Sequence, residues 1–155
     1  MAEIDLDEAS RRILAALQAD GRQTLQDVAE RAGLSPTPCW RRMKAMEEAG
    51  VIRGYVATLD REKLGLGLCV FAHVTLQRNA ENTGANFEQA MRDCPEVLEC
   101  YAVTGDADYI IKVVARDPKD YQRFLEAKIF RWPFVAQIRS SIALKEVKDV
   151  TALPL

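Results

Sequence analysis

The first third of the chain places apolar residues with the period of an α-helix. A first helix is predicted over residues 7–20, with Asp7 as its N-cap. A second, shorter helix follows, because Thr24 and Asp27 are spaced for a capping box and Gly33 provides a stop. The apolar residues that would face the interior are Ile13, Leu14, Leu17, Leu25, Val28, Ala29 and Ala32.

The stretch 34–50 predicts a third helix, in which Ser35 can act as the N-cap, Pro36 suits the first position and Gly50 ends it. Its two faces differ in chemistry. One face is apolar and consists of Cys39, Met43 and Met46. The opposite face is polar and mostly basic and consists of Thr37, Trp40, Arg41 and Lys44.

A short helix, a turn containing glycine and a second helix with basic residues near its start are typical of a helix-turn-helix that docks in the DNA major groove. The alternative is a surface helix with solvated charges. The formal net charge of −2 opposes binding to nucleic acid. However, residues 31–54 hold five cations and two acids, so the positive field is local. One copy would bind DNA weakly, and useful affinity would require an oligomer.

The residues after the third helix predict a connection between two modules. The segment 51–59 is rich in β-prone residues, and Arg53 would lie near the DNA side. A charged turn and two glycines follow over 60–67, which we interpret as a hinge.

The remaining chain predicts the order strand, helix, strand, strand, helix, strand. The strands are 68–76, 97–103, 109–115 and 135–147, and the helices carry the apolar residues Phe87, Ala90, Met91 and Cys94, and Tyr121, Phe124, Leu125 and Ile129. This βαββαβ order is typical of a ferredoxin-like fold, with both helices on one face of an antiparallel sheet. Apolar residues alternate onto both faces, so a second copy is expected to cover the open face, which predicts a dimer.

A turn between the second and third strands has residues suited to a small ligand. Gly105 lets backbone amides approach a carboxylate, and Asp106 and Asp108 can attract an ammonium group, which together suit a free amino acid. Ser140 on the last strand can add a hydroxyl. A plain hairpin turn is the alternative, because glycine and aspartate are common in turns.

Composition narrows the remaining classes of function. The four cysteines form no C-x-x-C pair and the single histidine is His73, so neither a metal site nor a disulfide framework is predicted, and no cofactor is expected. No leader or long apolar run is present, which predicts no membrane segment and a cytoplasmic protein. An enzyme is not expected, since no nucleophile motif or phosphate-binding glycine loop occurs.

The sequence resembles the Lrp/AsnC, or feast/famine, family of transcriptional regulators. The resemblance rests on the segments Leu17-Gln-Ala-Asp-Gly-Arg22, Gly33-Leu-Ser-Pro-Thr-Pro-Cys39, Gly50-Val-Ile-Arg-Gly-Tyr55 and Thr104-Gly-Asp-Ala-Asp-Tyr109, and it covers nearly the whole chain. The run Pro38-Cys39-Trp40 is similar to a subgroup that includes cysteine-responsive regulators. The family often has an acid where this chain has Ser10, which puts a salt bridge from the first helix in doubt.

The resemblance implies an α+β protein with three parts. These are an N-terminal three-helix, winged or helix-turn-helix domain over 1–52, a β linker over 53–67, and a ferredoxin-like domain over 68–155 that oligomerises and binds the effector. The family commonly forms dimers that assemble into octamers. The residues implied to face double-stranded DNA are Ser35, Thr37, Pro38, Trp40, Arg41, Arg42, Lys44 and Arg53. Arg42 lies next to the apolar face and is expected to bind a phosphate or a helix carboxylate rather than a base. Those implied to bind a small amino-acid effector are Thr104, Gly105, Asp106, Asp108 and Ser140.

The favoured hypothesis is a sequence-specific regulator of amino-acid metabolism, in which an effector changes the arrangement of dimers and thereby the spacing of DNA sites that can be bound together. The alternative is an effector-independent, architectural protein of the nucleoid type that bends or wraps DNA. In that case the segment Gly105–Asp108 would be only a turn.

Overall fold

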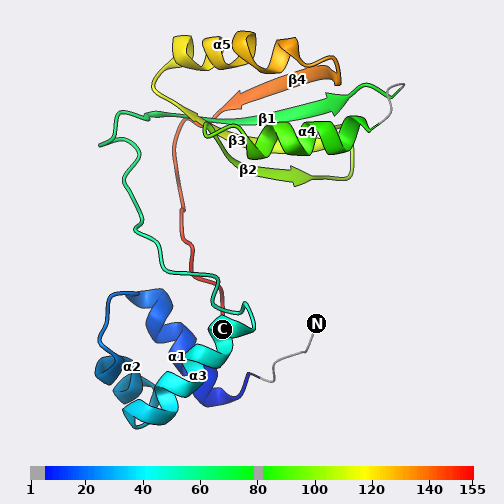
Figure 1. The fold of residues 1–155 in the computed structure, drawn as a ribbon. Coiled ribbons are helices and arrows are strands. Elements are labelled where there is room, and N and C mark those ends of the chain that lie inside the picture. Colours follow the sequence, from blue (N-terminus) through cyan, green and yellow to red (C-terminus); the bar gives the residue numbers. More distant parts are fainter. Residues whose placement is uncertain (1–5, 79–81) are drawn as a thin grey trace. The chain divides into compact units, whose positions relative to one another are not determined.

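The computed structural model describes residues 6–78 and 82–155 and divides the chain into two compact units (Figure 1). The first unit holds the described residues up to Thr58 together with Lys148–Leu155, and the second holds Leu59–Val147. Each unit has its own apolar core. We therefore describe each unit by itself.

The first unit is a bundle of three helices, α1 (Glu8–Ala19), α2 (Leu25–Ala32) and α3 (Pro36–Glu48). The predicted caps of α1 and α2 are confirmed. The Asp7 carboxylate accepts a hydrogen bond from the N–H of Ser10, and Thr24 and Asp27 form the reciprocal capping box. Gly33 ends α2 in the left-handed region with φ 69°. Ser35 precedes α3 in an extended conformation, but its side chain makes no capping hydrogen bond.

The predicted apolar faces of the helices meet in the core of this unit. Its buried members are Ile13, Leu14, Ala16, Val28, Ala29, Ala32, Cys39 and Met46. Met43 and Ile52 pack at the edge of this core. The C-terminal residues also belong to this unit, because the Gln18 side chain pairs with the backbone N–H and carbonyl of Leu153 at 2.6 and 3.0 Å. The core fixes which face of α3 points inward.

The connection after α3 differs from the predicted β linker. Residues 53–60 form no strand, because a strand requires a hydrogen-bonded neighbour and none of the described residues pairs with this segment. The predicted charged turn is present over 61–65, where Leu64 N–H donates to the carbonyl of Asp60. Arg61 closes the turn by donating to the carbonyl oxygens of Leu66 and Gly67.

The second unit confirms the ferredoxin-like order of elements. It consists of β1 (Leu68–Leu76), α4 (Thr83–Arg92), β2 (Val97–Ala102), β3 (Tyr109–Ala115), α5 (Pro118–Ala127), a 3₁₀ turn (Ile129–Arg131) and β4 (Val135–Ile142). The antiparallel sheet has the order β2-β3-β1-β4, and α4 and α5 cover one face (Figure 1). β4 ends at Ile142 rather than at the predicted Val147, because its pairing with β1 runs out there.

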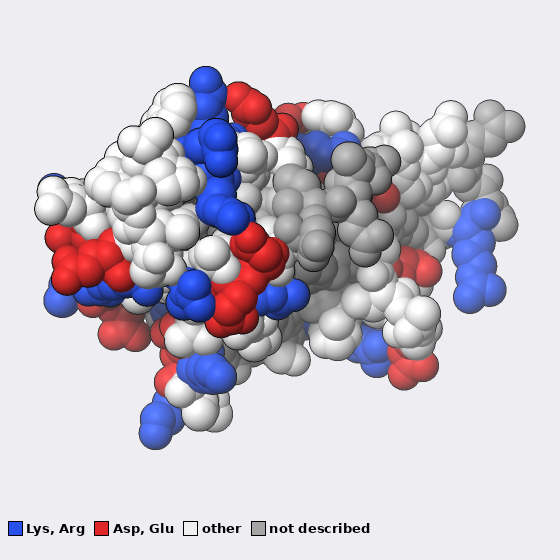
Figure 2. Space-filling model, turned by 90° about the horizontal axis from the view of Figure 1, so that it is seen from below, with Lys and Arg blue, Asp and Glu red and all other residues white. Residues whose placement is uncertain are grey.

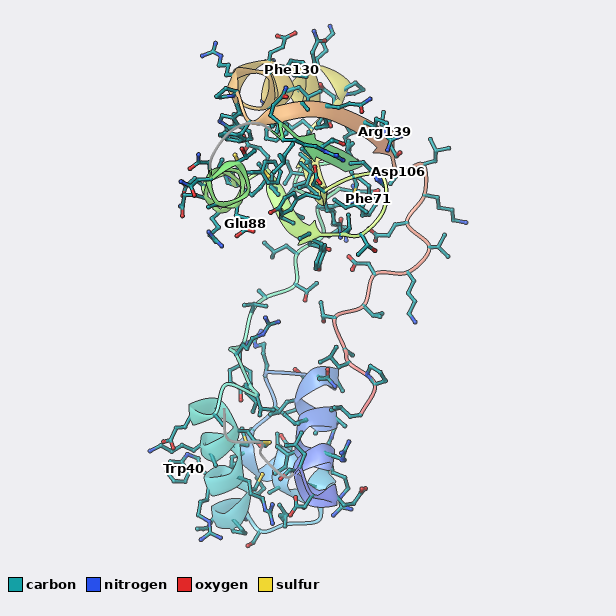
Figure 3. All side chains as sticks on the ribbon, turned by 90° about the vertical axis from the view of Figure 1, so that its right-hand side faces the viewer. Trp40, Phe71, Glu88, Asp106, Phe130 and Arg139 are labelled. Carbon is teal, nitrogen blue, oxygen red and sulfur yellow. The ribbon has the colours of Figure 1, made fainter. Side chains whose placement is uncertain are left out.

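The face of the sheet under the helices carries the core of this unit. Val70, Val74, Ile111 and Val113 are completely buried there, together with Phe87 from α4. The residues that alternate with them on β1 and β3 point to the other face. They include Phe71, and the paired residues His73 and Ile110. Figure 3 shows Phe71 on the side of the sheet away from the two helices.

One strand departs from simple alternation. The register of β2 against β3 shifts between Val97 and Glu99, so Val97 and Cys100 both pack against the core. Tyr101 remains on the open face, with 59% of its surface exposed. Strict alternation would place Val97 and Tyr101 on one face, and the irregular register separates them.

The core position of Ile111 gives a test of this packing. We expect Ile111→Ala to lower the free energy of unfolding by about 2–5 kcal/mol, because the side chain is completely buried and its removal leaves a cavity. Urea denaturation followed by circular dichroism measures the change. Val56→Ala is the control, since Val56 is 91% exposed, and it should change the free energy by less than about 0.5 kcal/mol.

Candidate functional site

The exposed face of α3 presents the residues that the sequence placed opposite the apolar stripe. Thr37, Trp40, Arg41 and Lys44 are all exposed, and Trp40 projects away from α1 and α2 (Figure 3). The Lys44 Nζ lies 5.3 Å from the centre of the Trp40 ring, a cation–π contact. This face can therefore offer a cation, an aromatic edge and hydroxyl donors to a polyanion.

Arg42 does not belong to that exposed face. Its Nη1 lies 2.7 Å from the Asp7 carboxylate and donates to the Ser10 hydroxyl at 3.1 Å. These contacts tie α3 to the start of α1. The salt bridge from the first helix, which Ser10 had put in doubt, is made instead by Asp7. Arg42 thus binds a helix carboxylate, which is one of the two partners that the sequence predicted for it, and it acts as a positioning residue.

The cations of α3 differ in how free they are. Lys44 lies 3.8 Å from the Glu48 carboxylate in addition to its contact with Trp40. Arg41 makes no ion pair with any residue of the described chain, and it is exposed. Of Arg41, Arg42 and Lys44, Arg41 is therefore the side chain that can bind a phosphate or a base without breaking an ion pair within the protein.

The remaining predicted DNA contacts flank this face. Ser35 is exposed just before the helix, and Pro38 is half-buried in its first turn. Arg53 is exposed on the connection after α3. Basic and acidic side chains are interspersed on the molecular face in Figure 2 rather than forming one continuous basic surface. The electrostatic attraction for DNA is consequently local.

Hydrogen bonds and a nearby guanidinium stabilise the charged form of Asp7 at the start of α1. The backbone N–H and side chain of Ser10, together with Arg42, hold the pKa of the Asp7 carboxyl below its ordinary value of 3.8. The carboxylate form is stabilised because it accepts these hydrogen bonds and lies beside the guanidinium. The ion pair between α1 and α3 is therefore kept at neutral pH.

The candidate ligand residues of the β2–β3 turn differ in whether they contact the rest of the protein. Thr104, Gly105 and Asp106 are exposed, and Gly105 has φ 112°, which an L side chain rarely adopts. Asp108 instead fastens the turn to β1. Its carboxylate accepts from the N–H of Leu76 at 2.7 Å and its own N–H donates to the carbonyl of Val74.

Ser140 is not brought to this turn. Its hydroxyl shares a hydrogen bond of 2.7 Å with the Tyr121 hydroxyl, on the side of the sheet that α5 covers. The Asp108 carboxylate is likewise engaged by the protein itself. Thr104, Gly105 and Asp106 are thus the part of the predicted ligand set whose side chains are not used by the protein itself, whereas one oxygen of Asp108 and the hydroxyl of Ser140 have internal partners.

Other kinds of site find little support within residues 6–78 and 82–155. No three histidine, cysteine or acidic side chains in that part of the chain lie close enough to hold a metal ion. Cys39, Cys69, Cys94 and Cys100 are free thiols, and burial raises the pKa of Cys39, Cys94 and Cys100. No described helix is long and apolar enough to cross a membrane.

Sequence reasoning missed two contacts that shape these sites. The bond from Leu76 to Asp108 joins residues 32 positions apart, and nothing local indicates it. The Tyr55 hydroxyl donates to the Glu47 carboxylate at 3.1 Å and fixes the connection against α3. An aromatic residue eight positions after a helix carboxylate is too weak a signal to have found it.

The fold and these sites define a class of protein: a helix-turn-helix unit joined to a ferredoxin-like unit with an exposed glycine-containing turn. Comparison with known proteins agrees. A model described as winged helix-turn-helix DNA-binding matches residues 6–53, and one described as the Lrp/AsnC ligand binding domain matches residues 69–153.

Individual relatives match over nearly the whole chain. The Bkd operon transcriptional regulator of Pseudomonas aeruginosa is 42% identical over 151 residues, which cover 97% of this chain and 99% of that protein. The leucine-responsive regulatory protein of Escherichia coli K12 is 38% identical over 149 residues, which cover 96% of this chain and 91% of that protein. The crystal structure of a transcriptional regulator in complex with L-Met from Neisseria meningitidis superposes with a TM-score of 0.92, at 38% identity and 96% coverage of both chains.

The chain belongs to the Lrp/AsnC family of transcriptional regulators. It is a DNA-binding regulator rather than an enzyme, as the sequence predicted. The family relation identifies the class of each unit.

The Asp7–Arg42 contact predicts a pH dependence of stability. Because the folded pKa of Asp7 is depressed, its contribution is present above the ordinary value of 3.8 and is lost as the pH falls through the lower folded value. We expect Asp7→Asn to lower the midpoint of thermal unfolding at about pH 7 and the difference from the wild type to close as the pH falls below the folded pKa, which lies under 3.8. Asp149→Asn on the exposed tail is the control. A difference independent of pH would contradict the role of the carboxylate.

Proposed function

We propose that α3 reads DNA through Arg41, with Trp40, Thr37 and Lys44 beside it, and that a small amino acid bound at the β2–β3 turn controls this binding. The observation that carries the DNA-reading proposal is the exposed and unpaired Arg41 on a helix whose other arginine is held by Asp7. A guanidinium without an internal partner can bond two acceptors on a guanine edge or one phosphate.

An assembly supports this function physically. One copy has a local and weakly basic surface, so several copies on one DNA are needed for useful affinity. The open face of the sheet exposes Phe71 and Tyr101 at 40% and 59%, together with the partly exposed His73 and Ile110. A second copy facing this surface would bury it, and we propose a homodimer through the sheet that assembles further, with an octamer as the expected size.

The exposed part of the turn suits a free amino acid. Gly105 opens the backbone so that amide groups can approach a carboxylate, and Asp106 can attract the ammonium group. Asp108 supports the site from behind by fixing the turn to Leu76. The structure from Neisseria meningitidis contains L-Met, and the relative from E. coli is named for leucine, which supports an amino acid as the effector class here.

The proposed setting follows from this function. A regulator that binds DNA and senses free amino acids acts in the cytoplasm, and regulation of amino-acid metabolism is the expected purpose. Relatives named for leucine and for the Bkd operon support that expectation.

Removing Arg41 tests the reading of DNA. We expect Arg41→Ala to weaken binding to a site selected from a random DNA pool by about 5- to 150-fold and to relax base preference at one position. Repeated selection with both proteins measures preference, and fluorescence anisotropy measures affinity. Arg22→Ala, which removes an exposed arginine outside α3, should leave both unchanged. Equal loss on all sequences would identify a phosphate contact instead.

Removing Asp106 tests the effector turn. We expect at least one of the twenty amino acids, cysteine included, to raise the thermal midpoint of the wild type by mass action, and Asp106→Ala to reduce that shift while retaining DNA binding. Asp149→Ala removes an exposed carboxylate elsewhere and should keep the shift. If no amino acid changes either the midpoint or DNA binding of the wild type, the effector-independent architectural function replaces this one.

A further inference from the structure

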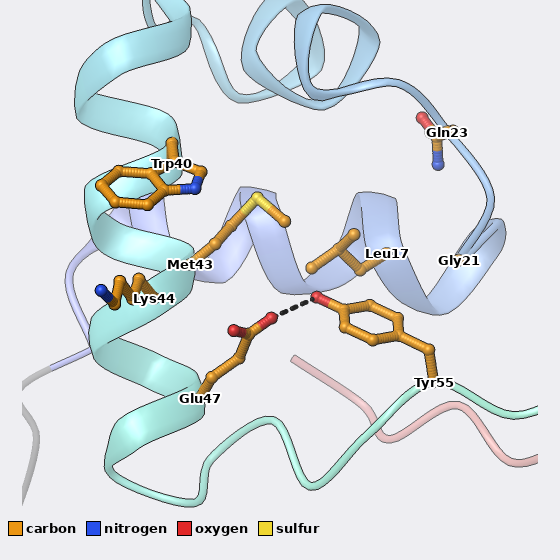
Figure 4. A pocket seen from close by; sticks show the side chains of 8 residues that line it. All are labelled: Leu17, Gly21, Gln23, Trp40, Met43, Lys44, Glu47 and Tyr55. Atoms are coloured by element: carbon orange, nitrogen blue, oxygen red, sulfur yellow. Dashed lines mark hydrogen bonds between the residues drawn. The ribbon is translucent and has the colours of Figure 1, made fainter.

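The helix-turn-helix unit contains a cavity of about 440 Å³ that the preceding function does not use. It lies between the C-terminal half of α1 and the middle of α3, and the chain after α3 closes it (Figure 4). A volume of this size is within the range of about 300–1,000 Å³ typical of sites for small molecules. Every residue that lines it belongs to this one unit.

The walls of this cavity combine apolar surface with two opposite charges. Leu17 from α1 and Met43 from α3 face each other across it (Figure 4). Lys44 and Glu47 lie three positions apart on α3, so their side chains emerge on neighbouring parts of one helix face. The Glu47 carboxylate is thus present at the pocket, and Lys44 lines its rim with its ammonium group near the Glu48 carboxylate and the Trp40 ring.

Aromatic rings bound the cavity on two sides. The Trp40 indole lies beside Lys44 at one rim, and the Tyr55 ring lies beside Gly21, whose Cβ position would be 3.5 Å from the ring. The Tyr55 hydroxyl donates to one oxygen of Glu47, and burial and this carboxylate raise the pKa of Tyr55, so the hydroxyl keeps its proton. The second carboxylate oxygen of Glu47 remains for another donor.

We propose that this cavity is a second ligand site, specific for a small zwitterion with an apolar side chain, which is the chemistry of a free apolar α-amino acid. Glu47 accepts hydrogen bonds from the α-ammonium group, and the side chain of the ligand packs on Leu17 and Met43. The Lys44 ammonium turns from the Glu48 carboxylate to bind the α-carboxylate of the ligand. A simple cation is disfavoured by Lys44, and a simple anion is disfavoured by Glu47. A ligand with both charges matches both groups.

This site would act on DNA binding directly. Trp40 and Lys44 line the cavity and also lie on the exposed face of α3 that the proposed function assigns to DNA. A ligand that occupies the Lys44 ammonium competes with a DNA phosphate for the same group. Linkage then requires that bound DNA lowers the affinity for the ligand by the same factor by which the bound ligand lowers the affinity for DNA. The proposal does not depend on the β2–β3 turn.

Tryptophan emission provides the test, because the chain holds two tryptophans, Trp40 and Trp132. Trp132 packs against Phe134 in the other unit, so Trp132→Phe leaves Trp40 as the reporter. Asp106→Ala is added to remove the proposed effector turn. We expect L-methionine or L-leucine to change the Trp40 emission of this double variant with saturation.

The ligand's two charges are then tested separately. N-acetyl-L-methionine lacks the ammonium group and L-methionine amide lacks the carboxylate, so each should bind about tenfold or more weakly than L-methionine. Glu47→Gln retains an acceptor for Tyr55 but removes the charge, and it should weaken L-methionine similarly. Glu30→Gln on α2 lies outside the cavity and should leave binding unchanged.

The outcomes separate the two sites. No saturating change with either amino acid, or equal binding after Glu47→Gln, would overturn the cavity proposal. A response of the Trp132→Phe protein that disappears when Asp106→Ala is added would assign the ligand to the turn and also overturn it. Failure of the turn itself has a different signature, because in the Glu47→Gln background, where the cavity is weakened, adding Asp106→Ala would then leave the remaining thermal shift unchanged.

Discussion

The orientation of α3 depends on one set of contacts, the attachment of its inner face to α1. Cys39 and Met46 are almost completely buried on that face, and Arg42 reaches the Asp7 carboxylate at 2.7 Å. Burial supplies most of the free energy, because each apolar side chain removed from water contributes about 1.5–3 kcal/mol, whereas a partly exposed ion pair contributes about 0–1 kcal/mol. The ion pair fixes the orientation, because it prevents α3 from rotating about its own axis relative to α1.

That rotation decides the chemistry of the outer face. With Arg42 turned towards α1, the adjacent Arg41 is turned outward, because neighbouring positions on a helix point about 100° apart. Two identical side chains in consecutive positions thus acquire different roles, one holding the helix and the other left free. A similar division occurs in the β2–β3 turn. One oxygen of Asp108 accepts the hydrogen bond from Leu76, whereas Asp106, two residues away, is exposed and holds no other element.

The sequence predicted most of the fold because its signals are local. Capping residues, helical spacing and the βαββαβ order each depend on residues within a few positions, and Thr24 and Asp27 form the box that their spacing indicated. The failures have non-local causes. The segment after α3 is β-prone but has no neighbouring strand, and the irregular register of β2 comes from its pairing with β3. Ser140 was assigned by its polarity, whereas its partner Tyr121 lies on a helix 19 positions earlier.

The same limit explains why the cavity beside α3 was invisible in the sequence. Leu17, Lys44 and Tyr55 have no common motif, and only the packing of three separate segments brings them together. The sequence did indicate that the positive charge available for DNA is small: residues 31–54 hold five cations in a chain of net charge −2. Once Arg42 is committed to Asp7, each remaining cation is a large part of the attraction for DNA. Occupying Lys44 with a small carboxylate would therefore matter more here than in a strongly basic protein, where the other cations would compensate.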